Sequence, residues 1–197
     1  MDTNLSRLTR REFFVSASLV FFGIAARHAF ASVHTDAYQS NPYISGYSGY
    51  NCYRVPALAI SKNGTVHAFC GARLDNCEDD GDHDIVVRRS SDGGQSWGPL
   101  LVIANDGRNR CDIPMPVVLS SGRVVLLWVW NEYVSRKEDR GSRRVMVCHS
   151  DDDGLSWTPA RDITNQVRLP GWKPWYGLGP GHGFVKQLQP GAGRIVI

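Results

Sequence analysis

The sequence lacks two features that would point to particular partners: an excess of one charge and a long hydrophobic run. Charged residues make up 21% of the 197 residues, and the formal net charge is only +3. Without residues 1–31 the balance is 18 basic against 17 acidic residues, which gives no reason to expect a nucleic-acid partner. The longest apolar run, Phe13–Ala26, has about 14 residues and is too short to cross a bilayer comfortably. We therefore expect no stable membrane span.

The sequence also lacks the cysteine spacing of a zinc site. Its five cysteines match neither common zinc-ligand pattern, and we expect no metal site and no cofactor. In an exported protein, Cys70 and Cys77 can close a small disulfide loop. The alternative is that the cysteines are buried as small hydrophobic residues or remain free thiols.

Residues 1–31 have the features of an export signal. The pair Arg10-Arg11 precedes the apolar run, and Ala29-Phe30-Ala31 has the small-x-small form of a cleavage site. The paired arginines resemble the twin-arginine signal, whose pathway exports folded proteins. A plain membrane anchor is the alternative. We expect an exported protein, periplasmic or secreted.

Two eight-residue segments, sixty residues apart, share one pattern. Residues 90–97 read SSDGGQSW and residues 150–157 read SDDDGLSW, and both fit S-x-D-x-G-x-x-W. We predict two tight turns in which the serine and aspartate side chains hydrogen-bond the turn backbone. The glycine then adopts a positive φ, and the tryptophan packs the loop onto a sheet. Two copies in equivalent places predict a repeat architecture, with the turns as structural fasteners away from any functional site.

After the leader, the sequence shows short β-rich segments and no helical period. We predict strands at residues 53–60, 65–73, 84–90, 100–103, 116–119, 123–130, 143–149, 184–188 and 194–197. Four short strands per sixty residues indicate the blades of an all-β propeller, and a β-sandwich is the disfavoured alternative. The predicted organisation is an export signal at 1–31, an approach segment at 32–52 and a partial propeller at 53–197.

The predicted strands amount to about two and a half blades. Propellers close with roughly four to eight blades, and an incomplete ring leaves an open sheet edge. We therefore expect this sequence to be the N-terminal part of a longer protein.

Residues near the ends of the predicted inner strands are candidates for chemistry. Arg54 lies on a short apolar strand, where its charge must be solvated or paired. Its planar guanidinium suits bidentate capture of a carboxylate. The alternative is an ordinary surface arginine.

The loop between Arg73 and Asp84 is crowded with carboxylates. Such crowding raises some pKa values, as a general acid requires. The alternatives are a solvated acidic loop and a calcium site. An EF-hand alignment on Gly81 puts Val87 where the bidentate glutamate belongs, so that motif fails, while another calcium geometry stays open. The acidic residues are Asp75, Glu78, Asp79, Asp80 and Asp82.

Residues 172–188 read WKPWYGLGPGHGFVKQL. The glycines permit close backbone approach, and the aromatic residues can pack against a sugar ring. The alternative for His182 is a structural histidine that is bonded to loop backbone.

Four features now combine into a family resemblance. YRVPAL at 53–58, the Arg73 strand with its acidic loop, the two turns and WYGLGPGHGF at 175–184 resemble the exo-α-sialidases (neuraminidases). Members of this family are six-bladed propellers, and their turns of this type are called Asp boxes. The Asp box occurs in many unrelated β-proteins, whereas these motifs in this order are jointly specific. The resemblance covers residues 53–197 and implies a sialidase-like, six-bladed β-propeller.

The resemblance implies roles for individual residues. Arg54 matches the first arginine of a triad that grips the carboxylate of sialic acid, and Arg73 matches a strand-end arginine near the amino-sugar side of the pocket. Asp79 best matches the acid/base aspartate, ten residues before Arg89, with Asp80 and Asp82 as the fallback candidates.

Four further positions follow from the same resemblance. Asp112 lies where the family places an Asn or Asp ahead of a P-x-P segment, although Ile113 occupies the expected Asn position. Trp128, Trp175 and Tyr176 either line the pocket for the N-acetyl and glycerol groups or pack in the core.

The implied activity is removal of terminal sialic acids from glycoproteins, glycolipids and oligosaccharides with retention. The aspartate protonates the leaving oxygen and then activates water, and a tyrosine takes the place of a carboxylate nucleophile. The family's tyrosine, its glutamate partner and two arginines come from later blades, so we expect this sequence alone to be inactive. The alternatives are a non-catalytic Asp-box propeller that binds glycans or protein partners, and a trans-sialidase.

Overall fold

The computed structural model describes residues 38–134, 141–172 and 176–197. The chain divides into two units, Met1–Asp36 and Ala37–Ile197, and all described residues belong to the second. The predicted export signal therefore lies outside the described residues. Within the described ranges, no helix combines the length and the apolar character that a membrane crossing needs.

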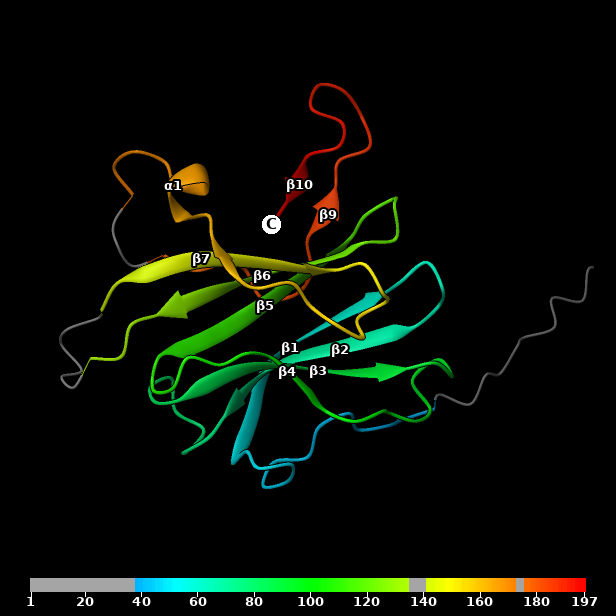
Figure 1. Ribbon diagram of the computed structural model, residues 1–197, viewed down its shortest axis with the longest axis vertical. Coiled ribbons are helices and arrows are strands. Elements are labelled where there is room, and N and C mark those ends of the chain that lie inside the picture. Colours follow the sequence, from blue (N-terminus) through cyan, green and yellow to red (C-terminus); the bar gives the residue numbers. More distant parts are fainter. Residues whose placement is uncertain (1–37, 135–140, 173–175) are drawn as a thin grey trace, which may run out of the picture. The chain divides into compact units, whose positions relative to one another are not determined.

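Eight strands form two four-stranded antiparallel blades (Figure 1). The first blade contains β1 (Cys52–Ile60), β2 (Val66–Arg73), β3 (His83–Ser90) and β4 (Leu101–Ala104). The second contains β5 (Arg110–Val118), β6 (Val124–Asn131), β7 (Arg143–Ser150) and β8 (Arg161–Asp162). A short helix, α1 (Thr164–Val167), follows, and then a hairpin of β9 (Phe184–Val185) and β10 (Ile195–Val196). The predicted blade repeat is confirmed.

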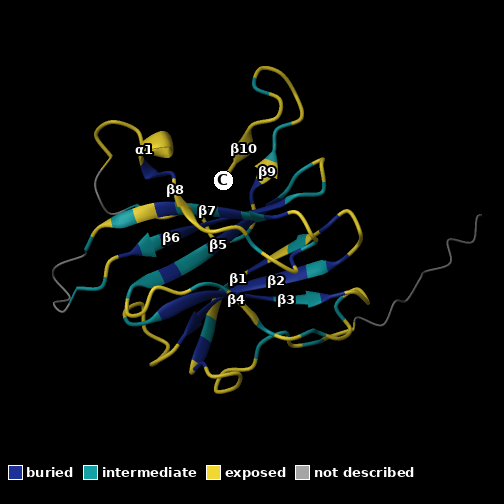
Figure 2. Cartoon of the chain, viewed as in Figure 1, coloured by how far each residue is buried: buried dark blue, intermediate teal, exposed yellow. Residues whose placement is uncertain are grey.

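Burial explains why the two blades pack against each other. The second strands of the two blades, β2 and β6, bury nearly every residue, whereas the short strands β4 and β8 bury none (Figure 2). One core cluster takes residues from both blades, among them Phe69, Ile85, Leu126 and Trp128. Burying each such side chain contributes roughly 1.5–3 kcal/mol. A shared core of this kind fixes the first blade on the second.

The first strand of each blade carries the same β-bulge. The register of β1 shifts between Arg54 and Ala57, and that of β5 shifts between Asp112 and Met115. Inside each bulge a β-branched residue with positive φ precedes a proline, at φ 54° for Val55 and 59° for Ile113. A β-branched residue in this region is strained by its side chain, and a bulge re-aims the neighbouring side chains. The two blades therefore present one equivalent side chain each, Arg54 and Asp112.

Both predicted turns are confirmed. In the first, Ser90 Oγ accepts from the Gly94 N–H at 2.8 Å, and Asp92 accepts from the Ser96 N–H at 2.9 Å. Hydrogen bonds from the Ser90 and Ser96 side chains hold the pKa of Asp92 well below its usual value. The second turn repeats this pattern of bonds, and the box glycines have φ +92° and +80°.

The second turn also fastens the two blades together. Asp153, inside that turn, accepts from Thr65 Oγ1 at 2.5 Å and pairs with Arg89 at 3.1 Å. Its backbone carbonyl lies 2.8 Å from Nε2 of the buried His67. Because a carbonyl can only accept, this bond places a proton on Nε2. The turn is therefore an inter-blade contact, in addition to the fastening role predicted for it.

The pair Cys70–Cys77, which the sequence left open as one possibility, does not form. The disulfide joins Cys52 to Cys77, whose Cα atoms lie 5.3 Å apart. Cys70 is buried in β2, and its thiol points to the Arg54 carbonyl at 3.0 Å. Sequence proximity was misleading because the Cys70 side chain is buried in the core, whereas Cys77 lies in the exposed loop after β2. Cys111 and Cys148 are also buried free thiols.

Replacing Gly154 by alanine should destabilise the protein strongly. A Cβ there would lie 2.6 Å from Nε2 of His67, whereas one on the equivalent Gly94 would meet nothing nearer than Trp97 at 3.7 Å. Both positions have similar positive φ, so the backbone strain is matched. We expect Gly154→Ala to lower the free energy of unfolding by about 2 kcal/mol more than Gly94→Ala, measured by urea denaturation. Equal losses would show that the second turn does not fasten the blades.

Candidate active site

Strand register brings five polar residues to one edge of the blades. Cys52 pairs with Arg73, Arg73 pairs with His83, and His83 pairs with Arg110. Arg54 lies two residues after Cys52 on β1, and Asp112 lies two residues after Arg110 on β5. Ser90, where the first Asp box begins, pairs with Val66 at the other end of β2. The candidate site and the Asp boxes therefore lie at opposite ends of the strands.

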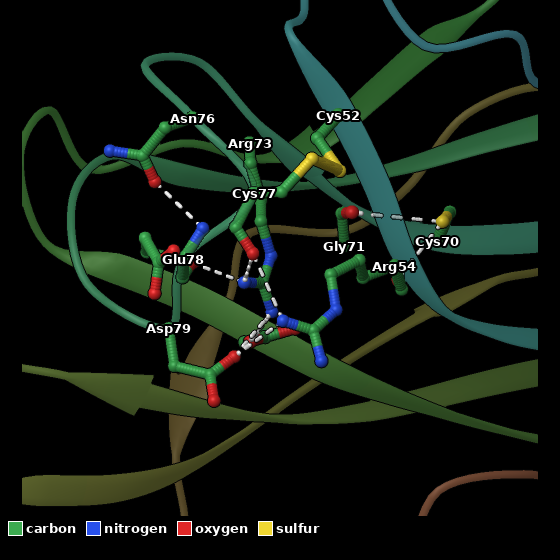
Figure 3. Close-up of a disulfide and its surroundings, with 10 residues drawn as sticks. Cys52, Arg54, Cys70, Gly71, Arg73, Asn76, Cys77, Glu78 and Asp79 are labelled. Atoms are coloured by element: carbon green, nitrogen blue, oxygen red, sulfur yellow. Dashed lines mark hydrogen bonds and ion pairs between the residues drawn. A yellow bond between two sulfur atoms is a disulfide. The ribbon is translucent and has the colours of Figure 1, made fainter.

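Two arginines meet one carboxylate at this edge. Nη1 of Arg54 and Nη2 of Arg73 each lie 3.0 Å from Oδ1 of Asp79 (Figure 3). Arg73 is 1% exposed, Arg54 is about half exposed at 47%, and Asp79 is 81% exposed. A buried guanidinium must be paired, and a fork of parallel donors suits carboxylates. Three side chains to which the family resemblance gives separate roles in one site thus lie in contact.

The backbone of the acidic loop also turns toward the guanidinium groups. The Cys77 carbonyl accepts from Nη1 of Arg73 at 2.8 Å and from Nη1 of Arg54 at 3.0 Å. Arg73 donates to the Glu78 carbonyl as well, and Arg110 donates to the carbonyl of Asp79. Three arginines therefore hold three consecutive carbonyls.

Asp112 lies next to Arg73 and His83. Its Oδ2 is 3.4 Å from Nδ1 of His83 and 3.6 Å from Nη2 of Arg73, and its Oδ1 accepts from the Ile113 N–H at 2.8 Å. Burial alone would raise the pKa of Asp112, but the contacts with His83, Ile113 and Arg73 outweigh it and lower the pKa. Asp112 is therefore an anchored anion beside the Arg73 charge.

Gly71 makes room for this carboxylate. A Cβ on Gly71 would lie 2.5 Å from Oδ1 of Asp112 and 3.3 Å from the Arg54 carbonyl. Because glycine has no side chain, β2 can lie close to both Asp112 and the Arg54 carbonyl at this position.

The fallback aspartate Asp82 has different surroundings. Burial, followed by the charges of Asp84 and Asp75, raises the pKa of Asp82. Asp84 is itself tied to Tyr50 Oη at 2.5 Å and to Asn105 at 2.7 Å. A raised pKa suits a general acid, which makes Asp82 a second candidate for the acid/base role. Of the two aspartates, only Asp79 has the contacts with Arg54 and Arg73 described above.

The predicted aromatic residues are spread over different places. Trp128 is 1% exposed and belongs to the shared core, which favours the packing alternative. Tyr176 is half-buried, and its hydroxyl donates to the Arg143 carbonyl at 3.0 Å. Next to it, a Cβ on Gly177 would lie 3.9 Å from Ile113, so this segment passes the bulge of β5. Trp175 lies outside the described residues.

Two residues of the site, Arg110 and His83, were not predicted from the sequence. One signal was present in the sequence. Aligning Tyr53-Arg54-Val55-Pro56 with Cys111-Asp112-Ile113-Pro114 superposes the two bulges. That alignment marks Asp112 as the partner position of Arg54 and places Arg110 at the same edge. Nothing comparable marks His83, whose place at the site follows from its strand pairs with Arg73 and Arg110.

Among the described residues, no three His, Cys, Asp or Glu side chains gather in a way that would hold a metal ion. The arrangement instead offers chemistry based on charge. The exposed side of Arg54 can bind an anion, Arg73 and Arg110 fix the loop, and Asp79 presents a solvent-accessible carboxylate beside them.

Comparison with known proteins identifies the family of the chain. Residues 64–197 match the family described as BNR repeat-like domain. The chain is 36% identical to human sialidase-3 over 158 residues, covering 74% of this chain and 36% of that protein. It is 28% identical to an exo-alpha-sialidase of Aspergillus fumigatus over 176 residues, covering 76% of this chain and 43% of the relative.

A solved structure shows the same fold. The Hadza microbial sialidase Hz136 superposes with a TM-score of 0.64 and 25% identity, over 73% of this chain and 32% of that one. The chain thus spans less than half the length of each of these relatives. The two blades and the following hairpin form part of a sialidase-like propeller, and the chain belongs to the BNR repeat-like domain family, with sialidases as its relatives.

Proposed function

We propose that this chain supplies the carboxylate-binding and acid/base part of an exo-α-sialidase, which hydrolyses terminal sialic acids from glycoproteins, glycolipids and oligosaccharides with retention. The observation that carries the proposal is the meeting of Arg54 and Arg73 on Asp79, at 3.0 Å each. The sialidase relatives support it.

Arg54 is the proposed ligand of the substrate carboxylate. Sialic acid carries a carboxylate on its anomeric carbon, and a guanidinium binds such a group through two parallel hydrogen bonds. Within the described residues, Arg54 makes its side-chain contacts through Nη1. The other side of its fork remains for the substrate, and the side chain is 47% exposed. Arg73 is proposed to fix the position of the Arg54 guanidinium through the two acceptors that both arginines contact, Asp79 and the Cys77 carbonyl.

Asp79 is the proposed acid/base. It would protonate the leaving oxygen and then take a proton from the attacking water. Because the anomeric carbon bears a negative carboxylate, a carboxylate nucleophile would meet like charge, and sialidases use a tyrosine. We assign that role to no residue of this chain, and we therefore expect residues 32–197 alone to release no sialic acid.

Asp112, Tyr176 and Trp175 are proposed to contact the sugar away from the anomeric centre. Asp112 lies beside Arg73 at 3.6 Å, and the segment at Tyr176 and Gly177 passes close to Ile113. An anchored carboxylate accepts hydrogen bonds from sugar hydroxyl or amide groups. Trp128 is not included because it is buried in the core.

Export is proposed as well. The pattern of residues 1–31 is that of a signal, and a disulfide between Cys52 and Cys77 suits an oxidising compartment. We propose that the protein acts in the periplasm or outside the cell.

Exchange of the acid/base carboxylate tests the proposal. In the full-length protein, we expect Asp79→Asn to lower kcat/KM for sialyllactose by about 100-fold or more, because general-acid assistance is lost. The loss should be smaller for an aryl sialoside, whose leaving group needs less protonation. Steady-state kinetics on both substrates measures this.

The matched control is Asp82→Asn, which removes the neighbouring carboxylate with the raised pKa. We expect it to change kcat/KM only a few-fold. If Asp82→Asn shows the leaving-group dependence and Asp79→Asn does not, the two assignments must be exchanged. If the unaltered full-length protein hydrolyses neither substrate, the proposed activity is wrong.

Gly71→Ala should weaken substrate binding through Asp112. The added Cβ would stand 2.5 Å from Oδ1 of Asp112 and must displace it. We expect KM for sialyllactose to rise by about 10-fold to 100-fold. Gly98→Ala is the control, because its Cβ would meet only the Arg89 carbonyl at 3.4 Å, away from the site. An unchanged KM in a folded Gly71→Ala variant would exclude Asp112 from the substrate pocket.

A further inference from the structure

We propose that the Cys52–Cys77 disulfide is a positioning element of the active site, and that its reduction reversibly lowers the activity of the site. This inference rests on the proposed function, because it concerns the same two arginines and the same aspartate.

The disulfide lies at the junction of the elements that build the site. Cys52 is the first residue of β1 and precedes Arg54 by two positions, and Cys77 precedes Asp79 by two positions. Figure 3 shows the bond above the point where the side chains of Arg54, Arg73 and Asp79 converge. One covalent bond therefore ties the strand that carries the anion-binding arginine to the loop that carries the acid/base.

Cys77 is also a hydrogen-bonding residue of the site. Its carbonyl accepts from Arg73 at 2.8 Å and from Arg54 at 3.0 Å. Two guanidinium groups held together repel each other unless acceptors stand between them. The disulfide fixes the acceptor that both arginines share, so it acts through their geometry and not through contact with substrate.

The rest of the loop has little else to hold it. Residues 74–80 are all exposed, and the loop from 74 to 82 contains no helix or strand. Leu74 bonds to the Asp82 carbonyl at its base, and Asn76 bonds to the Glu78 N–H within the loop. Exposed loops with few buried contacts open locally at low cost. Without the disulfide, the order of the loop would depend mainly on hydrogen bonds and ion pairs, above all those with the arginines.

The bond is accessible to reductants from one side. Cys77 is exposed, whereas Cys52 is 6% exposed. A thiolate of an external dithiol attacks Cys77 Sγ and breaks the S–S bond, and its second thiol then displaces the Cys77 thiol. The dithiol becomes a cyclic disulfide. Its two electrons and two protons end on Cys52 and Cys77 as thiols.

Amide hydrogen exchange tests the positioning role without any sialoside. We compare the full chain oxidised and after treatment with dithiothreitol. Amides of residues 74–82 should exchange at least 10-fold faster after reduction, while those of β2 and β6 keep their protection. No change in the loop would overturn the proposal. Loss of protection in the loop, β2 and β6 together would also overturn it, because the disulfide would then be a general stabiliser.

Kinetics of the full-length protein tests the switch. We expect dithiothreitol to lower kcat/KM for sialyllactose by about 10-fold per folded molecule, with KM and kcat both affected, and reoxidation to restore it. A Cys52→Ser/Cys77→Ser variant should have the low activity and no response to dithiothreitol. Cys148→Ala, which removes a free thiol buried in the core, should respond as the unaltered protein does.

The two arms separate failure of this inference from failure of the proposed function. Hydrolysis that stays unchanged on reduction overturns the switch and leaves the sialidase proposal intact. Absence of hydrolysis in the oxidised protein overturns the sialidase proposal, and the exchange experiment still decides whether the disulfide positions the loop.

Discussion

The buried guanidinium of Arg73 is the constraint on which the site depends. At 1% exposure it cannot be left unpaired, and its partners come from two elements. Asp79 and the carbonyls of Cys77 and Glu78 belong to the loop after β2, and Asp112 belongs to β5 of the next blade. Arg73 thus positions both the exposed loop and the second blade, because both supply acceptors for its buried guanidinium.

The repeat of the blades explains how those partners arrive. Each first strand carries a bulge in which a β-branched residue is held at positive φ before a proline. Such strain persists only where the surroundings over-determine the backbone. In β1 and β5, the strand pairs that precede and follow each bulge fix the backbone in this way. One structural device, used twice, presents an arginine from the first blade and an aspartate from the second at the same edge of the structure.

Local patterns in the sequence predicted the parts of this fold that are set locally. The Asp boxes, most of the strands and the grouping of Arg54, Arg73 and Asp79 follow from turn chemistry, alternation and family resemblance. The sequence prediction started β5 at residue 116 instead of Arg110, and it missed β8. The disulfide partner of Cys77, the burial of Trp128 and the place of His83 depend on how strands pair and blades pack. Those relations join residues far apart in sequence, such as Cys52 and Cys77, and no short motif reports them.

The two ends of the blades have opposite physical designs. At the Asp-box end, Asp153 of the second blade contacts His67, Thr65 and Arg89 of the first, so polar contacts join the two blades. At the other end, charged groups meet an exposed loop that one covalent bond ties to β1. Because the box end and the shared core hold the blades together, the other end can accept strained backbone and closely spaced charges. Stability and chemistry are separated along the strands, and this separation lets a loop with little packing of its own carry the proposed acid/base.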